Sequence, residues 1–401
     1  MDVKIAFLNG DLTEEVYIRP PPGLPHPAGY VGRLRRALYG LKHAPRAWFA
    51  KFSSSLICLG FVASNYDSAM FIRKTVVGHI VVLLYVDDMI VTGDDEAGIA
   101  DLKQQLHSLF EMKDLGYLRY FLGIEVAYSP EGYILSQSKY ISEVISREGL
   151  TDDRIMDSPI ELNHRLGPTD GDLLSDVTRY REVVGSLVYL TVTRPDITHV
   201  VHVVSQFVSA PRTTHWTVVI RILLYLRGTV HHDLLLSSTS DLVLTSYSDA
   251  DWAGDPTDRK STTGYCIILG NSLVAWKSKK QSVVSRTSAE AEYQAMATIA
   301  AELIWFRRLL EELGFPQLSA TPMFCDNQSA IQIAKNPVFH ERSKYIKIDC
   351  HFMRHHYLQG SLTLPHVSST SQLADVFTKS HTTPRFHHLI GKLILLAPSK
   401  V

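Results

Sequence analysis

The sequence predicts an α/β protein in which mixed sheets alternate with helices. Three observations favour this class. Short apolar runs typical of strands are interspersed with segments whose apolar residues recur every three or four positions. Between residues 242 and 380, three hairpin-like strands precede alternating helices and strands, a pattern typical of a mixed sheet covered by helices. Between residues 169 and 240 the pattern is mainly helical.

Composition and charge indicate an ordinary globular chain. Hydrophobic residues make up 45% of the 401 residues and charged residues 20%, which excludes disordered, collagen-like and mucin-like chains. The formal net charge is −1, so a nucleic-acid site must depend on local charge. The four cysteines stand far apart, which favours a reducing, intracellular compartment, cytoplasm or nucleus. We expect neither a membrane-spanning segment nor a signal peptide.

Breaks in the pattern divide the chain into four predicted regions. Residues 1–157 mix short strands with helices, and the segment that follows is punctuated by proline and glycine, which marks a boundary. Residues 158–241 are predicted to form a helical connection, residues 242–380 an α/β domain with a mixed sheet, and residues 381–401 a C-terminal tail. Two or three domains are expected for this length, at roughly 150 residues each.

Local spacing predicts the elements of the first region in order. Pro45 can occupy the first turn of a helix whose apolar residues include Trp48 and Phe52. The elements predicted after it are a hairpin over 70–74 and 79–86, a helix over 99–110 and a strand over 121–126.

The later regions are predicted in the same way. One helix of the connection carries an apolar stripe made by Tyr180, Val183, Val184, Leu187 and Val188. Two more helices are predicted over 196–208 and 213–227. The strands predicted next are 242–248, 263–269, 272–276, 322–325 and 362–367. The helices predicted beside them are 288–313, 328–335, 343–358 and 371–379.

A first pair of carboxylates, Asp87 and Asp88, interrupts an apolar run that starts at Ile80 and resumes at Met89. Ionised carboxylates are expensive inside a buried strand, so we expect a tight turn with both acids at its tip. Two neighbouring acids repel each other unless a cation neutralises them, and magnesium binds oxygen ligands. An exposed Asp-Asp turn would give the same dipeptide, but the apolar flanks favour a functional site.

A second carboxylate stands out on the helix predicted over 288–313. Thr287 and Glu290 fit a capping box, which gives Glu290 a structural role. Glu292 instead shares one helix face with the apolar residues Met296 and Ile299. A carboxylate on that face needs a cation nearby.

Three further acids are candidate partners of Glu292. Asp249 and Asp326 end predicted strands, and Asp375 lies in a predicted helix. Each has a plain alternative: a turn acid for Asp249, a helix N-cap for Asp326 and an acid favoured by the helix dipole for Asp375. Together, the four acids suggest a two-metal phosphodiester site.

Three segments resemble the reverse transcriptases of copia-type (Ty1/copia) retrotransposons. Tyr85-Val86-Asp87-Asp88 resembles their catalytic box, residues 2–12 their upstream metal-binding segment, and residues 33–49 the segment that contacts template and nucleotide. The resemblance implies an RNA-directed DNA polymerase that uses an RNA template, a DNA primer and dNTPs. It implies a palm fold in which Asp2 and Asp87 bind two metal ions, with Asp88 beside them.

The resemblance also implies contacts to nucleotide and template. Phe7 stands where the family places the aromatic residue that excludes a ribose 2′-hydroxyl; a core phenylalanine is the alternative. Arg36, Lys42 and Arg46 belong to a basic stretch without acids, which favours phosphate contacts; a solvated helix face is the alternative. His43 departs from the family pattern, which usually has Gln there.

Two departures concern the start of the chain. Ile5 stands where the family usually has a small or polar residue. Asp2 is the second residue and no fingers region precedes it, so we expect a frayed terminus, a poorly held Asp2 and an impaired polymerase.

Four segments in the last third are similar to ribonuclease H of the same branch: SYSDADWAGDP, SRTSAEAEYQAMA, FCDNQSAI and SQLADVFTK. The resemblance implies an RNase H-like mixed-sheet domain that cleaves the RNA strand of RNA–DNA hybrids. It implies Asp249, Glu292, Asp326 and Asp375 as catalytic metal ligands for two Mg²⁺ ions per site, for which Mn²⁺ can substitute. Asp251 is the residue most easily mistaken for one of them.

Other features of this segment leave alternatives open. Lys277, Lys279 and Lys280 offer phosphate contacts to a hybrid. Cellular enzymes often have a histidine in the loop before the last acid, where this chain has residues 368–371 without one. A cysteine and three histidines clustered near residue 350 could form a zinc module instead.

The resemblance covers essentially the whole chain and indicates the C-terminal part of a Pol polyprotein. The alternative to an enzyme is a catalytically dead retroelement remnant that at most binds nucleic acid.

Overall fold

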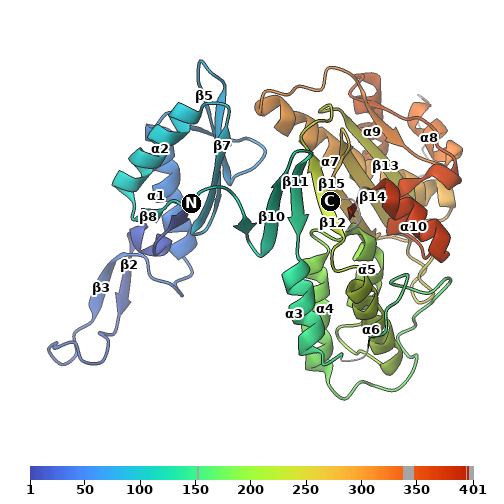
Figure 1. Ribbon diagram of the computed structural model, residues 1–401, viewed down its shortest axis with the longest axis horizontal. Coiled ribbons are helices and arrows are strands. Elements are labelled where there is room, and N and C mark those ends of the chain that lie inside the picture. Colours follow the sequence, from blue (N-terminus) through green and yellow to red (C-terminus); the bar gives the residue numbers. More distant parts are fainter. Residues whose placement is uncertain (151–152, 337–346, 394, 397–401) are drawn as a thin grey trace. The chain divides into compact units, whose positions relative to one another are not determined.

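The computed structural model describes residues 1–150, 153–336, 347–393 and 395–396 and confirms the predicted α/β class (Figure 1). The chain forms two compact units. The first comprises Met1–Leu118 with Glu311–Gly314, and the second comprises Arg119–Leu310 with Phe315–Val401. The predicted boundaries at residues 157 and 241 both fall within the second unit.

The first unit contains a six-stranded sheet in the order β4-β5-β6-β7-β1-β8. Along its central strands buried and half-buried residues alternate, so that Ile80, Val82 and Leu84 form a core with residues of two helices. The predicted hairpin is confirmed, since β5 and β6 pair antiparallel. The strands are β1 (Asp2–Val3), β4 (Val62–Ala63), β5 (Met70–Lys74), β6 (His79–Tyr85), β7 (Asp88–Gly93) and β8 (Met112–Lys113). The remaining elements are η1 (Ala6–Asn9), a ribbon of β2 (Asp11–Ile18) and β3 (Gly32–Arg36), and the helices α1 (Ala44–Cys58) and α2 (Glu96–Leu109).

The second unit contains a five-stranded sheet in the order β18-β12-β11-β10-β9. Its strands are β9 (Tyr120–Phe121), β10 (Ile124–Ser129), β11 (Gly132–Ser136), β12 (Asp233–Ser237) and β18 (Leu395–Leu396). The helical segment consists of α3 (Ser138–Arg147), α4 (Val177–Leu190), η2 (Pro195–Ile197), α5 (Thr198–Ser205) and α6 (Thr213–Gly228).

Two details of the helical segment differ from the sequence prediction. The stripe of α4 is buried at Tyr180, Val183, Val184 and Leu187, but Val188 is 48% exposed. The helix predicted over 196–208 is shorter and begins with the 3₁₀ turn η2. Proline is suited to the first turn of such an element because its missing N–H needs no partner there.

The second unit also contains a mixed five-stranded sheet in the order β15-β14-β13-β16-β17. Strands β13, β16 and β17 are parallel neighbours, and β14 and β15 extend the sheet as an antiparallel hairpin. The strands are β13 (Leu244–Ala250), β14 (Thr262–Leu269), β15 (Ser272–Lys280), β16 (Thr321–Phe324) and β17 (Leu362–Thr363). The helices and turns are α7 (Ser288–Glu312), α8 (Gln328–Lys335), α9 (Lys347–Leu358), η3 (Ser369–Ser371), η4 (Leu373–Phe377) and α10 (Thr383–Lys392).

The two faces of this sheet are covered by different elements. Met296, Ile299 and Leu303 of α7 pack with Tyr265 and Ile267 of β14 on one face. On the other face η4 lies against β14. The approach is close, because a Cβ on Gly264 of β14 would lie within 3.0 Å of atoms of Ala374, Phe377 and Thr378. In place of the helix predicted over 371–379, the chain forms the 3₁₀ turns η3 and η4. The start of the helix predicted over 343–358 lies outside the described residues. None of the helices in the described part of the chain has the length and apolar character needed to cross a bilayer.

Candidate catalytic carboxylate sites

The predicted acidic turn joins β6 to β7 in the first unit. Val86 adopts a left-handed backbone conformation with φ 51°, which closes the turn and places Asp87 and Asp88 immediately after it. The indole N–H of Trp48 donates to the carbonyl of Val86 at 2.8 Å and fixes the turn to α1. Sequence spacing identified Trp48 only as a core residue.

Asp2 lies in a strand that is paired on both sides. It is opposite Asp88 of β7 and Lys113 of β8, so the expectation of a frayed terminus is wrong. The terminal amine of Met1 donates to the carbonyl of Met89 at 2.8 Å. The backbone of β1 therefore carries Asp2 beside the acidic turn.

An aromatic pair lies next to the same turn. The Tyr39 hydroxyl donates to Asp87 Oδ2 at 3.0 Å, and its ring centroid is 4.6 Å from that of Phe7 in η1. Burial, and then the hydrogen bond to Asp87, raise the pKa of Tyr39. Tyr39 thus links the candidate sugar-contacting residue Phe7 to a candidate metal ligand, a role that sequence spacing missed.

The basic stretch of the first unit meets acids from another strand. Arg36, Lys42 and Arg46 have exposed side chains. The acids come from β2: Asp11, Glu14 and Glu15 pair with Lys51, His43 and Arg33 at 2.9, 3.5 and 3.4 Å. Exposed ion pairs contribute at most about 1 kcal/mol each, but these acids reduce the local positive charge that the stretch shows in the sequence.

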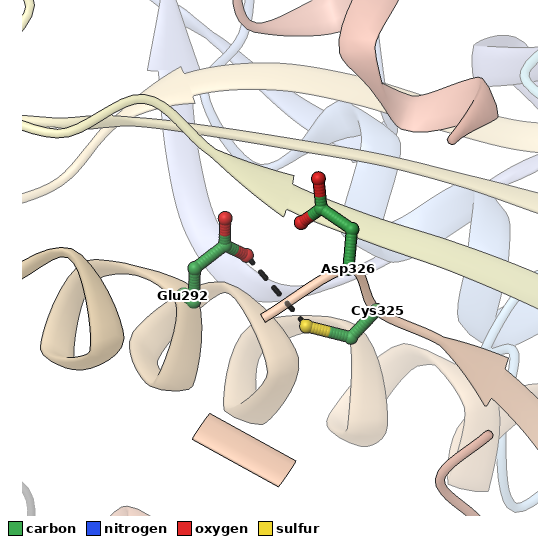
Figure 2. A group of neighbouring side chains, drawn as sticks. All are labelled: Glu292, Cys325 and Asp326. Atoms are coloured by element: carbon green, nitrogen blue, oxygen red, sulfur yellow. Dashed lines mark hydrogen bonds between the residues drawn. The ribbon is translucent and has the colours of Figure 1, made fainter. Parts of the chain in front are cut away.

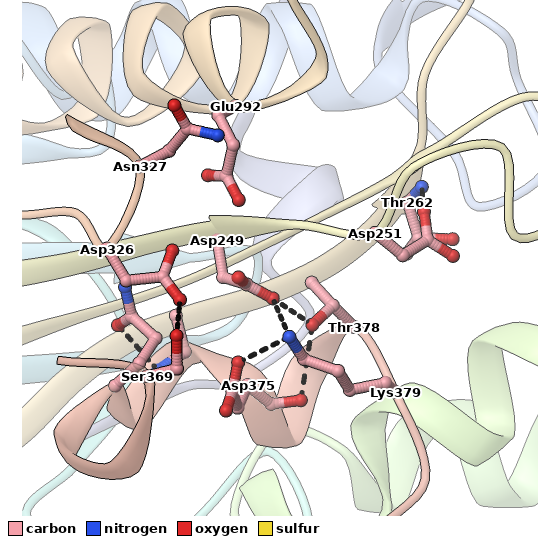
Figure 3. A network of polar contacts seen from close by, with 12 residues as sticks. Asp249, Asp251, Thr262, Glu292, Asp326, Asn327, Ser369, Asp375, Thr378 and Lys379 are labelled. Atoms are coloured by element: carbon pink, nitrogen blue, oxygen red, sulfur yellow. Dashed lines mark hydrogen bonds and ion pairs between the residues drawn. The ribbon is translucent and has the colours of Figure 1, made fainter. Parts of the chain in front are cut away.

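Four carboxylates from separate segments of the second unit converge at one end of the mixed sheet (Figure 3). We call Asp249, Glu292, Asp326 and Asp375 the carboxylate cluster. Asp249 lies within β13, one residue before its end, and is only 1% exposed, so it is not a turn acid. Ligand oxygens of Asp249, Asp326 and Asp375 all lie within 4.8 Å of one another.

Glu292 enters the cluster from α7, as the apolar stripe of that helix predicts (Figure 2). It is 5% exposed, and the thiol of Cys325 is 3.8 Å from its Oε2 atom. Ligand atoms of Glu292, Cys325 and Asp326 also lie within 4.8 Å of one another. Glu290 has the predicted structural role, since it accepts a hydrogen bond from the Arg286 N–H at 2.7 Å.

Asp326 and Asp375 are held by polar neighbours that sequence analysis did not single out. Ser369 in η3 donates its hydroxyl to Asp326 Oδ2 at 2.6 Å. Asn327, not Asp326, is the N-cap of α8, because its side chain accepts from Ala330 N at 3.0 Å. Lys379 lies 2.7 Å from Asp375 Oδ1. The spacing of four residues between Asp375 and Lys379 was the signal that could have identified this pair.

Asp249 also has polar partners after η4. The Thr378 hydroxyl donates to Asp249 Oδ2, and Lys379 Nζ lies 3.5 Å from the same oxygen. Asp251 is directed away from the cluster in Figure 3 and accepts a hydrogen bond from the backbone N–H of Thr262. Geometry therefore separates Asp251 from the four acids.

Burial makes the cluster strongly unfavourable for negative charge. Burial, followed by repulsion from Asp249 and Asp326, raises the pKa of Glu292 to about 9. Burial raises the pKa of Asp249 to about 6, although the nearby Lys379 ammonium opposes this. Burial also raises the pKa of Asp375. A bound cation would stabilise the ionised form of these buried carboxylates.

The predicted hybrid-contacting lysines differ in their surroundings. Lys277 and Lys279 of β15 have exposed side chains. Lys280 forms ion pairs with Asp255 at 2.5 Å and Asp258 at 3.0 Å.

The histidine-rich helix α9 does not assemble a metal site in the described residues. Within the described ranges, both groups of three ligand atoms closer than 4.8 Å belong to the carboxylate cluster and its neighbour Cys325. Neither group includes a residue of α9 or the acidic turn of the first unit.

Comparisons with known proteins agree with this architecture. A family described as reverse transcriptase (RNA-dependent DNA polymerase) matches residues 1–162. The chain is 42% identical over 395 residues to a retrovirus-related Pol polyprotein from transposon RE1 of Arabidopsis thaliana, and the match covers 98% of this chain and 27% of the relative. It is 34% identical over 308 residues to a putative transposon Ty5-1 protein of Saccharomyces cerevisiae, with 76% of this chain and 100% of the relative covered.

A solved structure shares the fold over most of the chain. The foamy viral protease-reverse transcriptase in complex with RNA/DNA hybrid has a TM-score of 0.52 and 11% identity, covering 92% of this chain and 43% of that chain. The chain spans 27% of the length of the Arabidopsis Pol polyprotein. It belongs to the copia-type retrotransposon Pol polyproteins, and its residues 1–162 match the reverse transcriptase family.

Proposed function

We propose that residues 242–380 form a divalent-metal-dependent ribonuclease H that hydrolyses the RNA strand of RNA–DNA hybrids. The observation that carries this proposal is the convergence of the carboxylate cluster. Its four acids come from β13, α7, the link between β16 and α8, and η4, and three are at most 5% exposed. Folding four acids together against their own repulsion is expensive unless a cation binds there.

The residues present fit two magnesium ions, with manganese as a substitute. All four side chains supply the hard oxygen ligands that these ions prefer. Among the described residues Glu292 forms no ion pair, so a bound metal ion can neutralise its negative charge. When bound, such ions supply an activated water and stabilise the leaving 3′-oxygen.

The neighbouring side chains orient the ligands. Thr378 and Ser369 each donate a hydroxyl hydrogen bond, to Asp249 and Asp326 respectively. Each bond occupies one carboxylate oxygen and orients the other. The exposed Lys277 and Lys279 are proposed to contact the hybrid backbone, whereas Lys280 contributes less because two acids already pair with it.

The test is hydrolysis of end-labelled RNA in an RNA–DNA hybrid by the whole chain with Mg²⁺. Glu292→Gln removes one proposed ligand at constant shape, and we expect a loss of at least about 100-fold. Glu290→Gln is the matched control, two residues away on the same helix, and should retain activity. No cleavage by the unmodified chain would instead favour the dead remnant, and a hybrid-binding assay would then measure what function is left.

A second proposal concerns the first unit, because a turn fixed by Trp48 carries Asp87 and Asp88 beside Asp2. We propose RNA-directed DNA synthesis from an RNA template, a DNA primer and dNTPs. Asp2 and Asp87 would hold the metal ions, with Asp88 beside them and Tyr39 orienting Asp87. Phe7 would contact the sugar, and Arg36, Lys42 and Arg46 would contact template and nucleotide phosphates.

Primer extension on an RNA template tests this second proposal. Asp87→Asn should abolish extension, while the exposed Asp101→Asn on α2 should not change it. Extension that survives in Asp87→Asn would exclude Asp87 from the chemistry. The expectation of weak synthesis stays a prediction, which the extension rate measures.

A further inference from the structure

Lys379 lies directly between two members of the carboxylate cluster. Its Nζ atom is 2.7 Å from Asp375 Oδ1 and 3.5 Å from Asp249 Oδ2 (Figure 3). Arg385 of α10 adds a second cation, 3.5 Å from Asp375 Oδ2, and donates to the carbonyls of residues 369 and 370. Asp249 and Asp375 are therefore already paired with positively charged side chains of the protein.

The opposite side of the cluster differs. Among the described residues, Glu292 and Asp326 form no ion pair with a lysine or arginine. Within the described ranges, the side chains that donate to them are the Cys325 thiol and the Ser369 hydroxyl, both uncharged. Because Lys379 and Arg385 make ion pairs with only one side of the cluster, the two sides are not equivalent for an incoming cation.

Lys379 is also able to leave. Its side chain is 43% exposed, and its four-carbon stem can swing the ammonium into solvent without unfolding η4. A divalent ion at Asp249 and Asp375 would need the oxygens that Lys379 contacts. If both contacted the same carboxylate oxygens, the Lys379 ammonium and the divalent cation would repel each other strongly in this partly buried site.

We propose that Lys379 is a positioning residue that competes with one divalent ion for Asp249 and Asp375, so that the two metal positions of the nuclease site differ in affinity. This inference rests on the proposed nuclease function. The ion nearer Glu292 and Asp326 binds first. The second ion binds only when Lys379 is displaced, so Lys379 sets the metal concentration at which the site is complete.

Calorimetric titration of the whole metal-free chain with Mn²⁺ tests the inference without depending on activity. All proteins in this titration carry Asp87→Asn, which disables the proposed polymerase site, and the carboxylate cluster should then bind two ions with different affinities. Lys379→Gln should bind the weaker ion about tenfold more tightly, which is within the usual range of coupling between two ligands. Lys379→Arg keeps the charge and should retain the original isotherm. Lys335→Gln, at the exposed end of α8, controls for the loss of one charge. If Lys379→Gln fails to fold by circular dichroism, Lys379→Met keeps the apolar stem and repeats the test.

The outcomes separate this inference from the nuclease proposal. Identical isotherms with and without Lys379→Gln would overturn the competition and leave the nuclease proposal standing. Weaker binding in Lys379→Gln would also overturn it, because Lys379 would then support the metal site. Absence of Mn²⁺ binding in every protein would overturn both.

Discussion

Replacing Glu292 by glutamine is expected to stabilise the metal-free protein, and more so as the pH rises. The Glu292 carboxyl is 5% exposed and its pKa is raised from 4.5 to about 9 by burial and by its acidic neighbours. Between these two values the folded chain binds a proton that the unfolded chain releases. Stability therefore falls with rising pH across this window. Glutamine has the same shape and does not titrate.

The size of the effect follows from the pKa shift. Each pH unit inside the window lowers the free energy of unfolding by about 1.4 kcal/mol for a single group. From about pH 5 to about pH 8, Glu292 alone therefore removes up to about 4 kcal/mol. Asp249 and Asp251, each with a pKa raised to about 6, add to the decline up to that pH. The pKa of Lys379 is raised, so this ammonium stays charged throughout and adds no slope.

Urea unfolding in the presence of EDTA, at pH 5 and at pH 8, tests this prediction by measuring the free energy of unfolding. The gain in unfolding free energy for Glu292→Gln should be small near pH 5 and several kcal/mol near pH 8. Glu290→Gln should show no such pH dependence, and added Mg²⁺ should narrow the difference by stabilising the unmodified chain. A gain of equal size at both pH values would refute the reasoning, because it would come from packing rather than from a buried proton.

Three further predictions concern other parts of the chain. Asp196→Ala should lower the free energy of unfolding of the second unit by about 3–5 kcal/mol in urea unfolding, because it leaves the buried Arg194 guanidinium, 2.6 Å away, without its carboxylate. An unchanged midpoint would contradict this. Ile5→Asn should stabilise the first unit by about 1 kcal/mol in thermal unfolding, because the exposed Ile5 has φ 54° and asparagine tolerates that region. Gly264→Ala should lower hybrid cleavage by about 100-fold, since its Cβ would displace the turn that carries Asp375; full cleavage would show that η4 can shift without affecting the site.

Local pattern was enough to predict much of the fold. An apolar run that ends in two acids predicted a strand followed by an acidic turn, as β6 and the turn after it show. Helical periodicity placed Glu292 on the buried face of α7. Both predictions depend on near neighbours in the chain. The left-handed Ile5 gives a physical reason for the small or polar residue that the family usually has there.

Other features depend on residues far apart in the sequence. The sequence offers Asp249 and Asp326 as partners of Glu292 but also gives each a plain alternative, and the distances that decide between them come only from the folded chain. The hydrogen bond from Ser369 to Asp326 also comes only from the fold. So does the ion pair between Lys379 and Asp249, which are 130 residues apart in the sequence.

The sequence by itself determined which side chains are acidic, which faces of strands and helices are apolar, and where an acid interrupts an apolar surface. The tertiary structure alone decided which charges neutralise which. It gave Asp249 and Asp375 a lysine, left Glu292 beside a thiol, and turned Asp251 toward a backbone N–H. The reason is that electrostatic interactions depend on distance in space and on burial, and neither is a property of position along the chain.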